Sequence, residues 1–309
     1  MLPAKTRGGS KGFYNRHRNN IEGYAFISLF IVGFVLFTVV PIVTSLFLSF
    51  ADYDVLSPPK FVGLKNYIRM FTDDKQFYTS FGVTIFYVLV SVPLRLMFAL
   101  AVALLLQRTT KLTTFYRAAY YLPTIIGNSI AIAVVWRRMF SADGLFNAIV
   151  NQIFNTNIQI SWIGGEHTAV WTLVLLAIWQ YGSSMLIFLS GLKQIPTSLL
   201  EAAEIDGAGK IQKFFKVTLP MLTPVVFFNV VMQLINGFMT FTQSFVITQG
   251  QPMDKTLFAT VYIYRSSFTY YRMGYGCAMA WVLLLFVAII TILLFKSSGT
   301  WVFNQADGK

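Results

Sequence analysis

Residues Ile195 to Pro220, IPTSLLEAAEIDGAGKIQKFFKVTLP, form the most informative segment of the chain. Ser198 and Glu201 have the S-x-x-E spacing of a capping box, so a short helix should begin there, and Gly207 offers a stop. Apolar residues on both sides of this glycine would give the segment one apolar surface. The pattern is compatible with two short helices that form a compact knob, and also with a lysine-rich loop that lies on the inner leaflet of a membrane.

Long apolar runs on both sides of this segment dominate the composition. Of the 309 residues, 56% are hydrophobic and only 12% are charged, whereas a soluble domain has roughly 25% charged residues. A helix needs about 20 mostly apolar residues to cross the hydrocarbon core of a bilayer. The runs of this length predict an all-α integral membrane protein with six transmembrane helices, at 24–50, 81–106, 118–140, 168–190, 217–248 and 276–295.

Basic residues indicate the orientation of these spans, because cytoplasmic flanks are enriched in Lys and Arg. They are concentrated in the two tails and in the loops after the second and fourth runs, whereas acids balance them in the other loops. Both termini are therefore expected in the cytoplasm. The predicted organisation is a basic tail at 1–23, a transmembrane domain at 24–296 with the cytoplasmic loop 195–220, and a C-terminal tail at 297–309.

Several function classes are disfavoured by what the sequence lacks. A single cysteine, Cys277, excludes an internal disulfide, and two distant histidines, His17 and His167, make a metal site improbable. The net charge of +12 is spread between apolar runs, so nucleic acid is not an expected partner. No acid lies within the six runs, which counts against an ion-coupled secondary transporter.

An enzymatic role is also disfavoured. No H-E-x-x-H motif, nucleophile elbow or paired carboxylate lies in the apolar runs, so no catalytic residue is assigned. The stretch from Asp206 to Lys210, DGAGK, lacks the first glycine of a P-loop, and Ile211 replaces the required Ser or Thr. The chain is therefore not expected to hydrolyse ATP itself.

Polar side chains inside the apolar runs are candidates for a substrate path, because such groups usually face a bundle interior or a water-filled space. The fifth run has five at helical spacing, which predicts one polar face with Phe238 and Phe241 beside it. Amides and aromatic rings suit a polyhydroxylated ligand, whereas hydrogen bonding between helices is the alternative. The five residues are Asn229, Gln233, Asn236, Thr240 and Gln243, and further candidates are Gln180, Tyr181, Ser183, Ser184, Asn128 and Ser129.

The loop at 195–220 carries a family resemblance. Glu201-Ala202-Ala203, Asp206-Gly207-Ala208 and Leu219-Pro220 resemble the EAA loop of the permease subunits of binding-protein-dependent ABC importers. The motif FVGLKNY at 61–67 is similar to that of the carbohydrate, maltose-type branch. The resemblance implies a multi-pass subunit of the bacterial or archaeal cytoplasmic (inner) membrane that forms half of the path of a sugar or oligosaccharide importer. Permeases for other small solutes have a similar loop and remain the alternative.

The same resemblance implies the partners. They are a second, homologous permease subunit, two ATPase subunits that bind ATP and Mg, and an extracytoplasmic solute-binding protein that docks on the loops around 51–79, 141–167 and 249–275. No cofactor is expected on this chain. The residues that would contact the ATPase subunits are Glu201, Ala202, Ala203, Asp206 and Gly207.

Arg95 departs from the family pattern, in which its position is more usually apolar. It lies near the centre of the second run, where an unpaired arginine costs about 3 kcal/mol on translocon scales. One explanation is an acid or carbonyl on a partner subunit. The other is that Arg95, with Arg137 and Arg138 at the outer end of the third run, favours an anionic substrate such as a uronate oligosaccharide.

Overall fold

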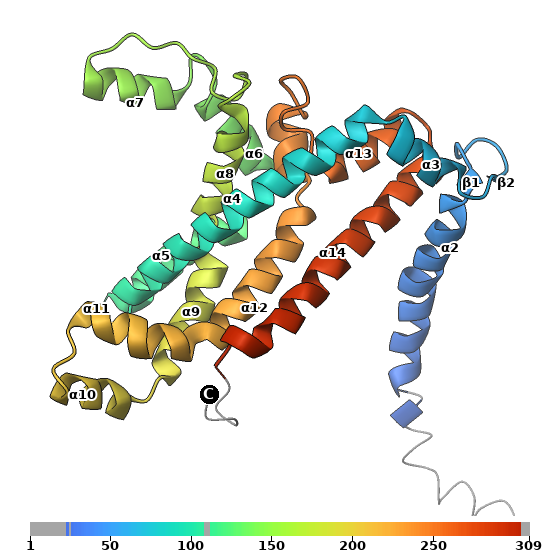
Figure 1. Cartoon of the computed structure of the whole chain (residues 1–309). Coiled ribbons are helices and arrows are strands. Elements are labelled where there is room, and N and C mark those ends of the chain that lie inside the picture. Colours follow the sequence, from blue (N-terminus) through green and yellow to red (C-terminus); the bar gives the residue numbers. More distant parts are fainter. Residues whose placement is uncertain (1–22, 25, 108–111, 304–309) are drawn as a thin grey trace, which may run out of the picture.

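The computed structural model describes residues 23–24, 26–107 and 112–303 (Figure 1). Most of the predicted N-terminal tail, the loop residues Arg108 and Lys111, and the last six residues of the chain lie outside these ranges. The described part is helical apart from one antiparallel hairpin, Ala51–Asp52 (β1) with Lys60–Phe61 (β2).

Four helical stretches are long and apolar enough to cross a membrane, and two bent helix pairs raise the number to six if each pair is one span. The all-α membrane class is therefore confirmed, with four to six candidate spans. The four continuous stretches are Phe26–Ser49, Lys75–Leu105, Lys210–Phe238 and Met273–Trp301.

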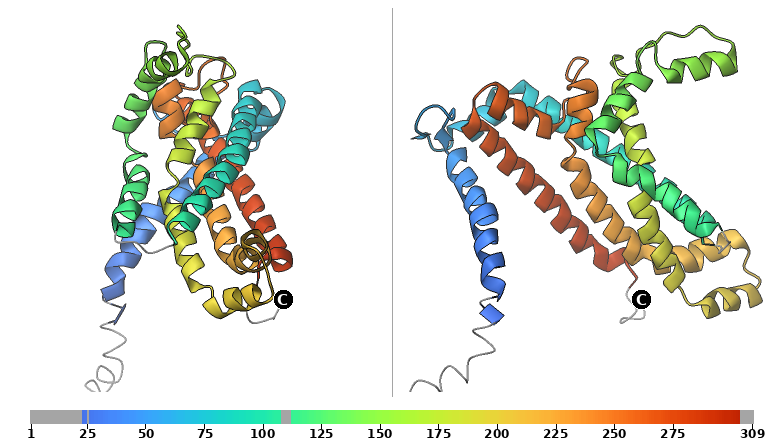
Figure 2. Two further views of the ribbon diagram at one scale, coloured as in Figure 1. Left: turned by 90° about the vertical axis from the view of Figure 1, so that its left-hand side faces the viewer. Right: turned by 180° about the vertical axis from the view of Figure 1, so that it is seen from behind.

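The first stretch stands apart from the other helices along most of its length. It contains a π-helical turn, Val35–Val39 (η1), and the helix Val40–Ser49 (α2). In Figures 1 and 2, α2 approaches the rest of the protein only near the hairpin, beside the helix Met273–Trp301 (α14). None of its most apolar 18-residue window is buried, so this stretch presents apolar side chains on all sides.

Polar groups fasten the end of α2 to its neighbours. The motif at 61–67 contributes here, because Gly63 takes a positive φ of 60° and leads into the helix Lys65–Thr72 (α3). The Asn66 side-chain amide donates to the carbonyls of Ser49 and Ala51, each at 2.9 Å. These bonds satisfy carbonyls that the end of α2 would otherwise leave unpaired.

The helix Lys75–Leu105 (α4) crosses the bundle diagonally and packs on three others, Ala169–Trp179 (α8), Gly182–Gln194 (α9) and Leu219–Phe238 (α12) (Figure 1). Close contact depends on small residues, as is usual between helices in lipid. A Cβ on Gly191 of α9, for example, would lie 2.7 Å from Val225 of α12. The core of the bundle contains Val88, Leu173, Leu176, Met185, Phe188 and Leu222.

Two predicted spans are broken rather than continuous. The run at 118–140 is divided between Thr113–Ile126 (α5) and Ile130–Met139 (α6), which meet at 95°, and the run at 168–190 between α8 and α9, which meet at 42°. Hydropathy averaged over a run does not detect a break of two or three residues, which explains the difference.

The fifth predicted span, 217–248, also needs correction. The helix begins earlier, at Lys210–Lys213 (α11), continues through the π-helical turn Phe214–Thr218 (η2) and α12, and ends at Phe238. A separate π-helical turn, Ser244–Thr248 (η3), follows. Residues 239–243 therefore lie beyond the helix in which they were predicted.

The remaining elements gather at the two ends of the bundle. Leu145–Phe154 (α7), Ala259–Tyr264 (α13) and Arg265–Thr269 (η4) lie at the same end as α3. The helix Thr197–Ile205 (α10) lies with α11 at the opposite end, which is also the end where α14 finishes (Figure 1).

Candidate functional site

A polar cavity lies where both helix breaks face α4 and the end of α12. Its volume is about 380 Å³. Twelve of its lining residues carry polar or charged groups, so it is the kind of polar space that a helix bundle keeps for function. The lining residues are Tyr87, Ser91, Val92, Arg95, Thr124, Asn128, Ala177, Gln180, Ser183, Gln233, Asn236, Gly237, Met239, Thr240, Phe241, Thr242 and Gln243.

Gln180 joins the two breaks. It follows the last residue of α8, and its side-chain amide donates to the carbonyl of Gly127, at 3.0 Å, in the gap between α5 and α6. Its own carbonyl accepts from the Thr124 hydroxyl at 3.1 Å. Broken helices in a bilayer need such bonds because their free carbonyls cannot reach water. These two hydrogen bonds connect the breaks and stabilise both of them.

Arg95 completes this junction. A terminal nitrogen of its guanidinium donates to the same Gln180 carbonyl, so Arg95 contacts a carbonyl of its own chain rather than needing one from a partner subunit. Its Nε is buried and has no hydrogen-bond partner among the described residues. The bond to Gln180 therefore uses only part of the guanidinium, which has five N–H donors.

The predicted polar face of the fifth run is only partly realised. Gln233, Asn236, Thr240 and Gln243 line the cavity, although the last two lie beyond the end of α12. Asn229 is completely buried elsewhere and donates to the Val225 carbonyl at 3.1 Å. Asn229 therefore does not line the cavity, although its spacing puts it on the same face of α12 as Gln233 and Asn236. Thr240 and Gln243 line the cavity from the segment after α12.

Two cross-helix bonds position the amides. Gln233 donates to the hydroxyl of Ser184 at 3.0 Å, and Gln243 donates to the side-chain oxygen of Asn128 at 3.1 Å. Ser184 itself is fully buried behind Gln233 and does not line the cavity. Ser184 therefore takes part in hydrogen bonding between helices and does not face the cavity. Gln233 and Gln243 each form a hydrogen bond to another segment and also face the cavity.

Other predicted residues lie away from the cavity. The Tyr181 ring packs against that of Phe98, with centroids 4.9 Å apart, and does not line the space. Ser129 caps α6 by accepting from the Ile132 amide. Phe238 is buried against Phe286, so Phe241 is the aromatic ring of the predicted pair that faces the cavity.

Sequence reasoning missed Tyr87 and Ser91. They precede Arg95 at intervals of four residues, which puts all three on one face of α4, and all three line the cavity. This spacing was a readable signal in the second run.

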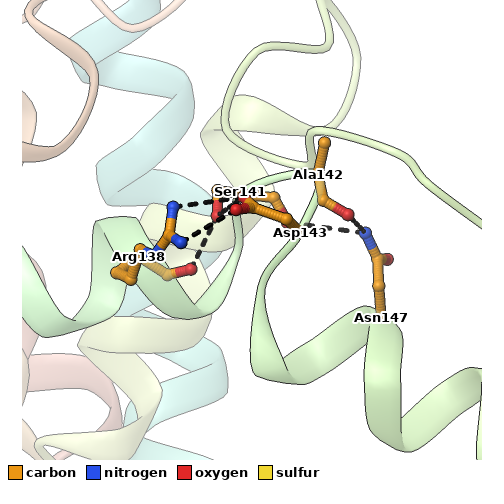
Figure 3. Close-up of polar contacts among 5 residues, drawn as sticks. All are labelled: Arg138, Ser141, Ala142, Asp143 and Asn147. Atoms are coloured by element: carbon orange, nitrogen blue, oxygen red, sulfur yellow. Dashed lines mark hydrogen bonds and ion pairs between the residues drawn. The ribbon is translucent and has the colours of Figure 1, made fainter.

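Arg137 and Arg138 do not contribute to the cavity. Arg138 pairs with Asp143 at 2.8 Å in the turn after α6, where Ser141 also donates to Asp143 (Figure 3). The Ser141 hydrogen bond, together with the Arg138 guanidinium, lowers the pKa of the Asp143 carboxyl. The same turn is fastened to α7 through Asn147, which donates to the Ala142 carbonyl (Figure 3). The Arg138–Asp143 pair is a local structural contact, and neither Arg137 nor Arg138 lines the cavity beside Arg95.

The predicted coupling loop forms two short helices, α10 and α11. Gly207 ends the first, as predicted, with a φ of 80° that favours glycine. The Ala208 amide donates to the Ala203 carbonyl at 2.9 Å, which closes the last turn. The capping box is not formed, because α10 begins at Thr197 with Pro196 at its N-cap and no side chain caps it.

An ion pair fixes the two short helices together. The Lys213 ammonium on α11 contacts the Glu204 carboxylate on α10, and this hydrogen bond lowers the pKa of Glu204. Several predicted contact residues remain exposed on the same knob, which leaves them free to meet another protein. They are Glu201, Ala202, Asp206 and Gly207, whereas Ala203 is partly buried.

A metal centre has no support in the part of the chain that the structure describes. No group of three His, Cys, Asp or Glu residues lies close enough to hold an ion there. Cys277 is a free, half-buried thiol within α14.

Comparison with known proteins decides the family. The family described as "Binding-protein-dependent transport system inner membrane component" matches residues 77–298. The chain belongs to this family. Its membership confirms the resemblance of the EAA loop, and with it the prediction of a multi-pass inner-membrane permease subunit rather than an enzyme.

Relatives of this permease share nearly its whole length. It is 52% identical over 94% of both chains to the "Probable ABC transporter permease protein YesP" of Bacillus subtilis (strain 168). It is 31% identical to the arabinooligosaccharides transport system permease protein AraP of the same organism, over 96% of this chain and 94% of AraP.

A solved structure shares the fold. The permease matches a chain of a bacterial ABC transporter involved in the import of the acidic polysaccharide alginate, with a TM-score of 0.77 and 19% identity, over 93% of this chain and 98% of that one. At this identity the likeness concerns the fold alone.

Proposed function

We propose that this permease forms half of the translocation path of an ATP-driven sugar or oligosaccharide importer. The observation that carries the proposal is the cavity at the two helix breaks. Its amides and hydroxyls can donate to and accept from sugar hydroxyls, and Phe241 offers a flat apolar surface. The similarity to AraP, a permease for arabinooligosaccharides, supports this substrate class.

The coupling role is assigned to the knob of α10 and α11. Ile205, Ile211 and Phe215 are each more than 60% exposed there, and exposed apolar side chains of this size mark contact surfaces. We infer that Glu201, Ala202, Ala203, Asp206 and Gly207 meet a partner ATPase subunit that binds ATP and Mg. The Glu204–Lys213 contact joins α10 to α11, so movement of α10 would reach α12 through α11 and η2.

The remaining partners follow from the other surfaces. The exposed apolar stretch Phe26–Ser49 suits a second, homologous permease subunit and the lipid around it. The end with α3, α7 and α13 would receive the extracytoplasmic binding protein. Six spans, with both tails and the coupling loop in the cytoplasm, are the topology that this assembly requires.

The test is ATP hydrolysis and uptake by the complex in liposomes, assembled with its partner subunits and binding protein. Glu201→Lys and Gly207→Asp should each reduce substrate-stimulated hydrolysis at least tenfold, because the first reverses a charge at the contact and the second strains a residue with positive φ. Gln212→Lys adds a positive charge at an exposed neighbouring position and is the matched control. It should retain coupling.

Two outcomes would contradict the proposal. Uptake that proceeds without ATP would make a gradient-driven carrier the better explanation. If another class of small solute stimulated ATP hydrolysis and no oligosaccharide did, the protein would still be an importer subunit, but the proposed substrate class would be wrong.

A further inference from the structure

Among the described residues that line the cavity, Arg95 is the one that carries a charge. It extends from α4 at the third position of the Tyr87, Ser91, Arg95 stripe, so two hydroxyl-bearing neighbours lie on the same face of that helix. Neutral amides and hydroxyls make up the polar lining contributed by the other segments. The electrostatic character of the space is therefore set by a single guanidinium.

The contacts of Arg95 leave this charge uncompensated within the described chain. The ion pairs of the described residues are Arg138–Asp143, Lys213–Glu204 and Lys255–Glu166, and all three lie at the ends of the bundle. Arg95 instead donates to the Gln180 carbonyl, which already accepts from Thr124. A carbonyl supplies partial charge only, and the buried Nε has no hydrogen-bond partner in the described part of the chain.

We propose that Arg95 binds the carboxylate of an acidic sugar, so that the permease carries uronate-containing oligosaccharides. The inference rests on the proposed function. A guanidinium is always charged and can hold a carboxylate through two parallel N–H donors. A neutral sugar has no carboxylate that could accept these two hydrogen bonds. Asn236, Thr240 and Gln243 line the same space and can serve the hydroxyls of the sugar ring.

A purely structural role makes a different prediction. If Arg95 serves only to cap the carbonyl end of α8, its loss should weaken transport of charged and neutral sugars alike. If Arg95 contacts a carboxylate, its loss should instead weaken transport of the charged sugar alone. The pair of substrates needed is a uronic-acid oligosaccharide and the same oligosaccharide with its carboxyl groups reduced to primary alcohols.

The experiment measures kcat and KM of uptake for both sugars, using the assembled complex in liposomes with its binding protein. Direct binding of both sugars to the complex in nanodiscs, without binding protein, removes selection by that protein. Wild type should favour the acidic sugar, and Arg95→Gln should lose about tenfold or more of kcat/KM on the acidic sugar but less than about threefold on the reduced one. Arg95→Lys should recover part of the loss.

Asn236→Ala is the matched control in the same cavity, and it should reduce uptake of both sugars by similar factors. Equal losses for both sugars in Arg95→Gln, or wild-type binding and uptake of the reduced sugar alone, would overturn the inference and leave the importer intact. If the Arg95→Gln complex does not assemble, the Arg95→Lys complex provides the test. Unchanged preference of the Arg95→Lys complex for the acidic sugar supports a charge contact. Absence of any preference for the acidic sugar in wild type refutes that contact. Failure of wild type to take up any oligosaccharide with ATP would refute the proposed function itself.

Discussion

Asp74 connects several helices at the end of the bundle that has α3. One oxygen of its carboxylate accepts from the Phe77 amide at 3.0 Å and caps α4. The other oxygen accepts from the hydroxyls of Tyr262 on α13 and Tyr275 on α14, both of which are buried. A single carboxylate therefore joins three helices and also satisfies one of the unpaired donors in the first turn of α4, the Phe77 amide.

Replacement of Asp74 should destabilise the permease. Asp74→Ala removes a cap and two charge-assisted hydrogen bonds, so we expect a loss of about 3 kcal/mol in the free energy of unfolding. Thermal unfolding of the purified protein in detergent would show it as a lower melting temperature. Asp73→Ala removes an adjacent, exposed carboxylate and should change the melting temperature little. Equal effects of the two changes would show that the Asp74 contacts are not what holds these helices.

At the scale of elements, the continuous helices were predictable and the broken ones were not. The second and sixth apolar runs correspond to α4 and α14, because unbroken hydropathy over such lengths has few other solutions in a bilayer. The breaks at Gly127 and Gln180 depend on side-chain and carbonyl contacts between segments about 50 residues apart. Hydropathy contains no information about such contacts.

The residues of the cavity were likewise predictable from the sequence only in part. Polar residues inside apolar runs pointed to Gln180, Asn128, Gln233, Asn236, Thr240 and Gln243, and all six line it. The partner of Arg95 could not be predicted, since it is a main-chain carbonyl with no sequence signature of its own. Asn229 shares their helical face but is buried away from the cavity, because helical spacing identifies a face and not the depth at which that face opens into a space.

Gly127 tests whether the break between α5 and α6 matters for transport. A Cβ at this position would lie 2.5 Å from the Pro123 carbonyl oxygen and 2.6 Å from the Gln180 side chain. Gly127→Ala should therefore push Gln180 from its contact, cost about 1–3 kcal/mol and reduce uptake. Thermal unfolding and transport assays measure the two effects.

The matched control for Gly127 is Gly82→Ala in α4. A Cβ at Gly82 meets nothing within 4 Å, so the change should be neutral or should stabilise the helix by up to about 1 kcal/mol. Full transport activity in Gly127→Ala, at a normal melting temperature, would mean that the Gln180 junction is not needed for the path.

At the scale of the whole molecule, charge differs between the two ends. The end with α10 and α11 has Lys193, Lys210, Lys213, Lys216 and Lys296 against three acids, Glu201, Glu204 and Asp206, in its described residues, whereas the loops near α3, α7 and α13 include seven acids beside their basic residues. Short cytoplasmic loops retain positive charge during insertion. The knob of α10 and α11 should therefore face the cytoplasm, as an ATPase partner requires.

Cysteine labelling tests this orientation directly, because Cys277 is the single cysteine of the chain. In a Cys277→Ala background, Ser57→Cys places a thiol in the exposed loop between β1 and β2, and Gly209→Cys places one beside α11, where an added Cβ meets nothing within 4 Å. A membrane-impermeant maleimide added to intact spheroplasts should label the thiol at position 57 and reach position 209 only after permeabilisation. Transport activity of each variant confirms that it is folded. The reverse labelling pattern would place the knob outside the cell, where no ATPase subunit could reach it. That result would also refute the coupling role of Glu201 and Gly207.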